Sequence, residues 1–292
     1  MLPLVTVRPD ATSRPSHRRD DADSMPLIAL DFDGTVCVGD APVWAYAEAV
    51  ITRALDADPE RGSALAERIR ERLGAFLDGA PDAGEHLDGY AAVAALAAEQ
   101  VDGDDLQAAY AASRRALAAG EIRVAAPRGL ADLLADLGGS VRRVLVTNAP
   151  EDGIRSTLEA IGLAGLIDET VTSVGKPAGW QGLLPRMLAH RAPAAVMAVG
   201  DIWGNDLRPP LEAGCCTALI DRFGHRAGPA HLTGARFEQL YAGIRAWAAD
   251  PALFAANHTA HVAPLDEPTP TPTQIQLQAD TQAHTQTGTG TP

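Results

Sequence analysis

The stretch LIALDFDGTVCVGD, residues 27–40, decides how this sequence is interpreted. Its apolar start runs directly into Asp31 and Asp33, which are separated by one residue and followed by glycine and threonine. Two carboxylates this close repel each other, and burying them without a partner is unfavourable enough to force one of them to take up a proton. We therefore expect either a positive charge between them or proton chemistry at one of them.

The composition argues against several classes of protein. The chain has 292 residues, of which 46% are hydrophobic, so it can bury a sizeable core and carry an inserted or second domain. Its net charge of −14, without a basic stripe, argues against binding of nucleic acid or of an anionic membrane surface. The sequence also contains no apolar run long enough to span a bilayer.

The cysteines and the two ends of the chain carry weaker signals. The chain has an odd number of cysteines, and their spacing fits neither a disulfide framework nor a metal site; they are Cys37, Cys215 and Cys216. Residues 1–24 are charged and contain proline, which predicts a disordered extension without a signal-peptide pattern, and Met25 is an alternative start. Because the cysteines fit no disulfide framework, we expect a cytoplasmic protein. Residues 257–292 are rich in Thr, Gln and Pro and are predicted to form a low-complexity, disordered tail.

Apolar runs alternate with helical patterns over much of the chain. Runs typical of strands buried on both faces lie at 27–32, 143–147, 194–200 and 216–220, with a weaker one at 169–174. Helical patterns lie at 127–137, 151–161, 180–190 and 206–213. This alternation predicts an α/β fold with a Rossmann-like, doubly wound parallel sheet, in which ligands bind at the carboxyl ends of the strands.

Residues 40–122 break the alternation. They contain no convincing strand, and amphipathic or alanine-rich helical patterns lie at 44–57, 60–76, 90–100 and 104–119. We expect an inserted all-helical cap that covers the carboxyl edge of the sheet. The α/β core then consists of residues 25–39 and 123–250.

Three further motifs extend the pattern of the opening stretch. VLVTN ends an apolar run in Thr147 and Asn148, VGKP carries Lys176, and AVGDIWGNDL contains Asp201 and Asp206. Together with DFDGTV, and in this order, they resemble the haloacid dehalogenase-like (HAD) superfamily on its phosphatase side. The combination is specific because each motif follows an apolar run, whereas each alone is a weak signal.

The resemblance implies roles for the motif residues. Asp31 is the nucleophile that forms an aspartyl-phosphate, and Asp33 is the general acid and base. Lys176 neutralises charge on the nucleophile and the phosphate, and Thr147 and Asn148 bind the substrate. An aspartate at the position of Asp33 also separates the family's phosphatases and mutases from its dehalogenases, which lack it.

The resemblance also implies a Mg²⁺ cofactor, which is the positive partner that the acidic pair requires. Its expected protein ligands are Asp31, the backbone carbonyl of Asp33, and Asp201, while Asp206 holds a metal-bound water or Lys176. Oxygen ligands are those that Mg²⁺ prefers, and the cation draws the phosphate toward the carboxylate.

Simpler interpretations exist for each motif taken alone. The acidic pair fits a solvated turn, and Thr147 with Asn148 fits a helix cap. Lys176 fits a surface lysine, and Asp206 fits a helix N-cap. The occurrence of all four motifs in one order favours the catalytic interpretation.

The predicted function is Mg²⁺-dependent hydrolysis of a small-molecule phosphate monoester. A phosphomutase on the same residues and a non-catalytic binding or regulatory module are the alternatives. No nucleic-acid or membrane partner is expected, and the oligomeric state and physiological substrate stay open. We expect the cap to select the leaving group, so that substitutions within residues 79–90 alter substrate preference.

Overall fold

A computed structural model describes residues 24–80 and 86–263. The expected N-terminal extension, residues 81–85 of the cap and most of the expected tail lie outside the described residues. None of the helices in the described ranges is both long and apolar enough to cross a membrane.

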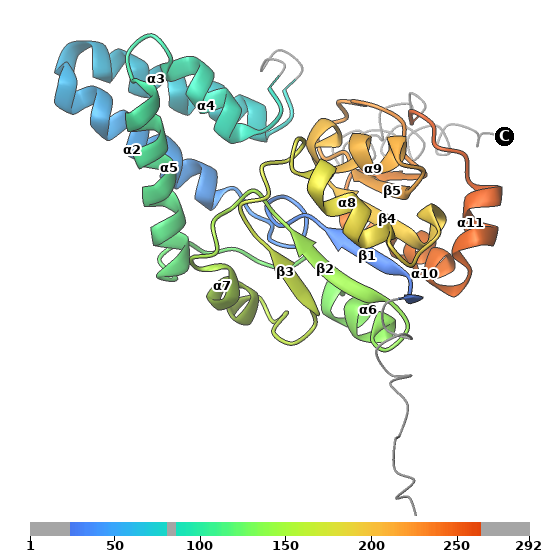
Figure 1. Ribbon diagram of the computed structural model, residues 1–292. Helices are drawn as coiled ribbons and strands as arrows, with labels where there is room; N and C mark the ends of the chain where they lie inside the picture. The colour runs from blue at the N-terminus through green and yellow to red at the C-terminus, as the bar shows by residue number, and fades with distance from the viewer. Residues whose placement is uncertain (1–23, 81–85, 264–292) are drawn as a thin grey trace, which may run out of the picture. The chain divides into compact units, whose positions relative to one another are not determined.

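The core is a six-stranded parallel sheet with strand order β3-β2-β1-β4-β5-β6 (Figure 1). Its strands are β1 (Leu27–Leu30), β2 (Arg142–Val146), β3 (Glu169–Val171), β4 (Val196–Gly200), β5 (Cys216–Ile220) and β6 (Leu232–Gly234). This order confirms the doubly wound architecture expected from the alternating pattern.

The order of the strands fixes where a ligand can bind. The chain passes from β1 outward through β2 to β3 and then returns to place β4 on the other side of β1. In open parallel sheets the ligand crevice lies outside the carboxyl ends of the strands at such a reversal. Leu30 pairs with Val199, so the residues that follow β1 and β4 leave the sheet side by side.

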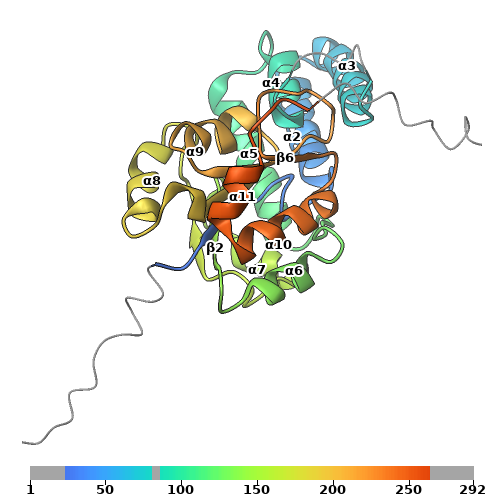
Figure 2. The same cartoon turned by 90° about the vertical axis from the view of Figure 1, so that its right-hand side faces the viewer.

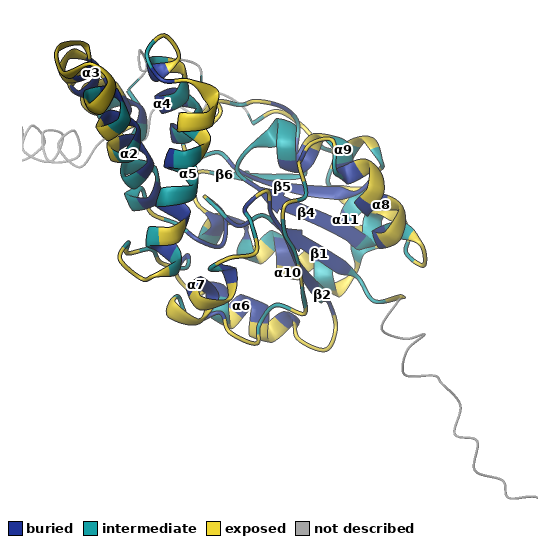
Figure 3. Cartoon of the chain, turned by 60° about the vertical axis from the view of Figure 1, so that its left-hand side comes forward, coloured by how far each residue is buried: buried dark blue, intermediate teal, exposed yellow. Residues whose placement is uncertain are grey.

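Both faces of the sheet are buried, which explains the continuous apolar character of its strands. Ile28 and Leu30 face a cluster formed with α6 (Leu130–Leu137), α7 (Ile154–Ala160) and α10 (Tyr241–Ala249). Leu27 and Ala29 face the opposite way, against α8 (Trp180–Leu188). Figure 3 shows the central strands β1, β2, β4 and β5 as buried between helices whose outer surfaces are exposed, whereas the edge strands β3 and β6 are only partly buried. Figure 2 brings α10 and α11 (Pro251–Asn257) forward.

An all-helical insertion separates β1 from β2, as the sequence predicted. Its helices are α2 (Ala41–Ala57), α3 (Pro59–Leu77), α4 (Gly89–Ala97) and α5 (Gly103–Ala118). Asp58, Asp88 and Asp102 cap the starts of α3, α4 and α5 by accepting backbone N–H groups that have no partner within the helix. The insertion has its own apolar cluster, centred on Val50, Ile69 and neighbouring residues.

The two chain segments that enter and leave the insertion are paired. Val38 and Ala125 exchange two backbone hydrogen bonds of 2.8 and 3.0 Å as an isolated antiparallel bridge. Two paired backbone segments, around Val38 and Ala125, therefore join the insertion to the sheet close to Asp31 and Asp33.

The structure differs from the sequence prediction after β4 and near the C-terminus. The helix expected at 206–213 is a π-helix, η2 (Trp203–Leu207), followed by α9 (Arg208–Glu212). The strand β6 and the helices α10 and α11 were not predicted, because β6 spans only three residues and the helical segments carry no motif. His261, which the prediction assigned to the tail, exchanges two hydrogen bonds with Ala230.

The close crossing of α2 and α3 generates a stability prediction. A Cβ on Gly62 would lie 2.7 Å from backbone atoms of Ala54 and Leu55, whereas a Cβ on Gly74 of the same helix meets nothing within 4 Å. We expect Gly62→Ala to lower the free energy of unfolding by about 1–3 kcal/mol, because α2 and α3 must separate. Gly74→Ala is the matched control and is expected to raise it by about 0.4–1 kcal/mol. Urea unfolding followed by circular dichroism measures both, and equal effects would refute the close-crossing argument.

Candidate active site

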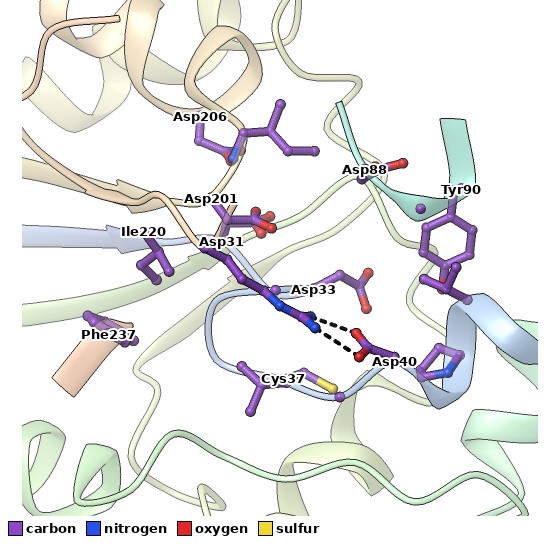
Figure 4. Close-up of a pocket in the computed structure, with 18 of the residues that line it drawn as sticks. Asp31, Asp33, Cys37, Asp40, Asp88, Tyr90, Asp201, Asp206, Ile220 and Phe237 are labelled. Atoms are coloured by element: carbon purple, nitrogen blue, oxygen red, sulfur yellow. Dashed lines mark hydrogen bonds and ion pairs between the residues drawn. The ribbon is translucent and has the colours of Figure 1, made fainter. Parts of the chain in front are cut away.

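Three carboxylates from distant parts of the chain converge at the carboxyl edge of the sheet. Asp31 follows β1, Asp201 follows β4, and Asp206 lies in the π-helix η2. One carboxylate oxygen of each lies within 4.8 Å of the others. Figure 4 shows these side chains directed toward one cavity.

Two glycines permit this convergence. Gly34 has φ +78°, in the left-handed region, and a Cβ there would lie 2.0 Å from Oδ2 of Asp201. A Cβ on Gly200 would lie 2.4 Å from Cβ of Asp206. The glycine after Asp33 is therefore needed for both the turn and the approach of Asp201.

Lys176 is the ammonium group within this cluster. Its Nζ donates hydrogen bonds of 2.6 Å to Asp31 and 2.6 Å to Asp206, and its side chain is 3% exposed. Burial alone would lower the pKa of Lys176, but the charges of Asp31 and Asp206 outweigh it and raise that pKa. The lysine is thus a fixed positive charge shared by two of the three acids.

One lysine does not neutralise the cluster. Burial, followed by repulsion from Asp31, raises the pKa of Asp206 to about 7 although Lys176 acts in the opposite direction. The same two causes raise the pKa of Asp201 well above its usual range. Oδ1 of Asp201 is buried and has no hydrogen-bond partner among the described residues. An unpartnered buried oxygen beside two further carboxylates is the donor set that a hard divalent cation requires.

Asp33 has a different partner, which the sequence did not reveal. Its Oδ1 accepts a hydrogen bond of 2.8 Å from Nη1 of Arg114, a buried residue of the cap helix α5. Burial raises the pKa of Asp33, and the charge of Arg114 opposes that rise. The carboxylates of Asp31 and Asp33, one residue apart, thus have separate cationic partners.

Thr147 and Asn148 follow β2 at the same edge of the sheet. The hydroxyl of Thr147 accepts a hydrogen bond from the Ala149 N–H. The Asn148 amide bonds the backbone of Lys176 twice, accepting from its N–H at 2.6 Å and donating to its carbonyl at 3.1 Å. Asn148 therefore fixes the backbone from which the lysine extends, while both residues line the cavity.

Two indoles hold the loop that carries Asp201 and Asp206. Nε1 of Trp180 donates to the carbonyl of Asn205 at 2.8 Å. Nε1 of Trp203 donates to the carbonyl of Pro229 at 3.0 Å. These bonds and the contact of Ile202 N–H with Asp206 Oδ2 at 3.0 Å fix the loop from both sides.

The cavity at this edge has a volume of about 710 Å³ and is lined by both the core and the cap. The cap side contributes Asp88, Tyr90 and Tyr110. Arg222, from the loop after β5, forms a bidentate ion pair with Asp40 at the start of the cap, at 2.6 and 2.9 Å (dashed in Figure 4). A cavity of this size fits a small molecule.

The structure brings the site residues predicted on the core together at one cavity, and the sequence prediction did not include most of the cap residues that line it. Asp88 and Tyr90 fall within residues 79–90, which were expected to set substrate preference. Arg114 and Arg222 had no local signal, because neither belongs to a motif and both meet their acidic partners only through the fold.

Comparison with known proteins places the chain in a family. A model of the haloacid dehalogenase-like hydrolases matches residues 25–214. Among curated proteins, none matches the chain.

Solved structures similar to this one include the HAD hydrolase YfnB of Bacillus subtilis bound to magnesium, with 15% identity over 76% of this chain and 99% of that one and a TM-score of 0.50. A predicted phosphoglycolate phosphatase from Haemophilus somnus is 17% identical over 66% of this chain and 84% of that one, with a TM-score of 0.43. An L-2-haloacid dehalogenase from Xanthobacter autotrophicus is 16% identical over 76% and 98%, with a TM-score of 0.43. At such identities the likeness concerns the fold.

The acidic cluster generates a prediction about cation binding and pH. Since the pKa of Asp206 is raised from 3.8 to about 7, its contribution to stability is present below about pH 4 and is lost as the pH rises through about 7. If a divalent cation binds in place of that proton, the rise in Tm caused by Mg²⁺ should be larger at pH 8 than at pH 5.5. At a Mg²⁺ concentration of one hundred times Kd we expect about 2.7 kcal/mol, or roughly 5–10 °C.

Differential scanning fluorimetry tests this without any assay of activity. Asp201→Asn removes one of the repelling charges, so the cation-free variant should be at least as stable as the wild type at pH 8 and should lose the response to Mg²⁺. Asp132→Asn, on the exposed surface of α6, is the matched control and should respond as the wild type does. A response that survives in Asp201→Asn would place the cation elsewhere.

Proposed function

The chain belongs to the haloacid dehalogenase-like hydrolase family, and on that premise we propose that it hydrolyses phosphate monoesters of a small molecule with the help of Mg²⁺. The observation that carries this proposal is the convergence of Asp31, Asp201 and Asp206 around the ammonium of Lys176. Phosphoryl transfer needs an oxygen nucleophile and neutralisation of charge, and this group of residues supplies both.

In the first step a carboxylate oxygen of Asp31 attacks phosphorus, and the bond from phosphorus to the leaving oxygen breaks. Asp33 gives its proton to that oxygen, so the product leaves as an alcohol. In the second step Asp33 takes a proton from a water molecule, whose oxygen attacks the phosphorus of the aspartyl-phosphate. Inorganic phosphate leaves, and Asp31 is regenerated as a carboxylate.

Lys176 stabilises the charge that develops during both steps. It already lies 2.6 Å from the Asp31 oxygen, so it lies beside any phosphoryl group that Asp31 attacks. Thr147 and the backbone at the ends of β1 and β2 face the same cavity and are proposed to bind phosphoryl oxygens. Asn148 is proposed to act by holding the Lys176 backbone.

The proposed cation site consists of the carboxylates of Asp31, Asp201 and Asp206, with the backbone carbonyl of Asp33. The unpartnered Oδ1 of Asp201 supports this assignment. When bound, Mg²⁺ supplies neutralisation of the negative charges on the nucleophile and the phosphate.

Asp33 is what favours a phosphatase over a dehalogenase. A halide leaves carbon as a stable anion and needs no proton, whereas an alkoxide is a poor leaving group that requires a general acid. Asp33 lies in the cavity, and the cluster beside it has an excess of negative charge that displacement of a halide would not require. Both features fit a phosphate ester.

The decisive experiment compares two products. Purified protein with Mg²⁺ is incubated with a panel of phosphate monoesters and, separately, with 2-haloacids, and phosphate and halide release are measured. We expect phosphate release alone, its loss in Asp31→Asn, and a fall in kcat of about 10²–10⁴-fold in Asp33→Asn. Asp132→Asn serves as the control that should keep wild-type activity.

The other outcomes are equally informative. Halide release would identify a dehalogenase, and transfer of the phosphoryl group to a second hydroxyl without free phosphate would identify a mutase. Equal background rates in the wild type and Asp31→Asn across the whole panel would refute catalysis at this site.

A further inference from the structure

An ion pair between the buried Arg114 of the cap and the partly exposed Asp33 connects the cap to the loop that follows β1. Arg114 lies on α5, 81 residues from Asp33, and its side chain is 5% exposed. It donates to Asp33 at 2.8 Å, and its guanidinium lies over the ring of Phe32 at 5.8 Å from the centroid. Phe32 is itself buried and lies between the two acidic residues in the sequence.

The surroundings of Arg114 leave it little freedom. Tyr90 and Tyr110, whose ring centroids are 5.6 Å apart, border it from the cap. Among the described residues, the charged and titratable groups facing this region are Asp33, Asp31 and Cys37 from the core and Asp88, Tyr90 and Tyr110 from the cap. Burying a guanidinium is costly unless an anion accepts its hydrogen bonds, and the anion here is Asp33.

The ion pair is asymmetric in its access to the cavity. Asp33 lines the cavity and its side chain is 35% exposed, whereas Arg114 is absent from the lining among the described residues. A substrate in the cavity can thus meet the carboxylate of Asp33, with the guanidinium behind it. In this arrangement Arg114 orients Asp33 and does not itself bind the ligand.

We propose that Arg114 is a positioning residue for the acid–base step: it fixes the Asp33 carboxylate toward the leaving-group oxygen, and, because it belongs to the cap, it makes that orientation depend on the cap being in place. The proposal rests on the proposed phosphatase function. Arginine suits this role because its planar fork holds a carboxylate in one orientation, which the flexible ammonium of lysine does not.

The proposal predicts an effect that depends on the leaving group. An alkyl alcohol must be protonated as it leaves, so its departure depends on the position of Asp33. A 4-nitrophenolate leaves as an anion, so its departure depends much less on a general acid. Hydrolysis of the aspartyl-phosphate also uses Asp33 but is common to both esters, so the comparison uses kcat/KM, which reports the steps through departure of the leaving group. Loss of Arg114 should therefore lower kcat/KM for alkyl phosphates, with little change in kcat/KM for 4-nitrophenyl phosphate.

The experiment uses the full chain with Mg²⁺, 4-nitrophenyl phosphate and the best alkyl phosphate from the panel. Arg114→Met should lower kcat/KM for the alkyl ester by about 10²-fold and kcat/KM for the aryl ester by less than about threefold. Arg115→Met, an exposed arginine on the same helix, is the matched control and should change neither. Arg114→Lys should recover part of the alkyl rate, because it keeps the charge without the fork.

A double-mutant cycle separates positioning from a general structural role. If Arg114 acts through Asp33, then Arg114→Met should have little further effect on alkyl ester hydrolysis in an Asp33→Asn background. Equal losses of kcat/KM on both esters, an unchanged kcat/KM for the alkyl ester, or additive losses in the cycle would overturn the proposal. Should thermal unfolding show that Arg114→Met is not folded, Arg114→Lys and Arg114→Gln provide the same comparison. Failure of the proposed function itself is distinct, since the wild type would then release no phosphate.

Discussion

Repulsion among the carboxylates at the carboxyl edge of β1 and β4 is the constraint on which the site depends. One carboxylate oxygen from each of three acids lies within 4.8 Å of the others, and Lys176 donates hydrogen bonds to two of these acids. Three negative charges and one positive charge leave an excess of two, which equals the charge of one divalent cation. The pKa values of Asp201 and Asp206 are raised for the same reason, because binding of protons is the other way to remove this excess of negative charge.

The fold solves this problem by separating the two acids of the opening stretch. In an extended strand residues i and i+2 point to the same side, but the chain leaves β1 after Leu30 and turns at Gly34, so the two side chains reach different partners. Asp31 turns to the core lysine and Asp33 to the cap arginine. Each acid therefore has its own counter-charge. The core supplies Lys176 to Asp31, whereas the cap supplies Arg114 to Asp33. Under the proposed function, this ion pair couples the chemistry of the site to the insertion.

The sequence predicted the core half of the site because parallel strands bring their carboxyl ends to one edge. A polar residue directly after an apolar run is therefore placed near the others by topology alone, as Asp31, Thr147 and Asp201 are. Arg114 follows no such rule, since it lies within an alanine-rich helix and its partner is 81 residues away. The strand β6 was missed because three residues are too few to show the periodic pattern of side chains that predicts a strand.

Charge also bears on the order in which ligands enter under the proposed function. A phosphate monoester carries up to two negative charges, and the chain has a net charge of −14. The acidic side chains that line the cavity outnumber the basic ones: Asp31, Asp33, Asp40, Asp88, Asp201, Asp206 and Glu238 against Lys176, Arg222 and Arg236. A dianion approaching this group without a cation meets repulsion in a partly desolvated cavity, where Coulomb forces are strong. Occupation of the cation site before substrate binding follows from this balance, and it makes the cation part of substrate recognition as well as of chemistry.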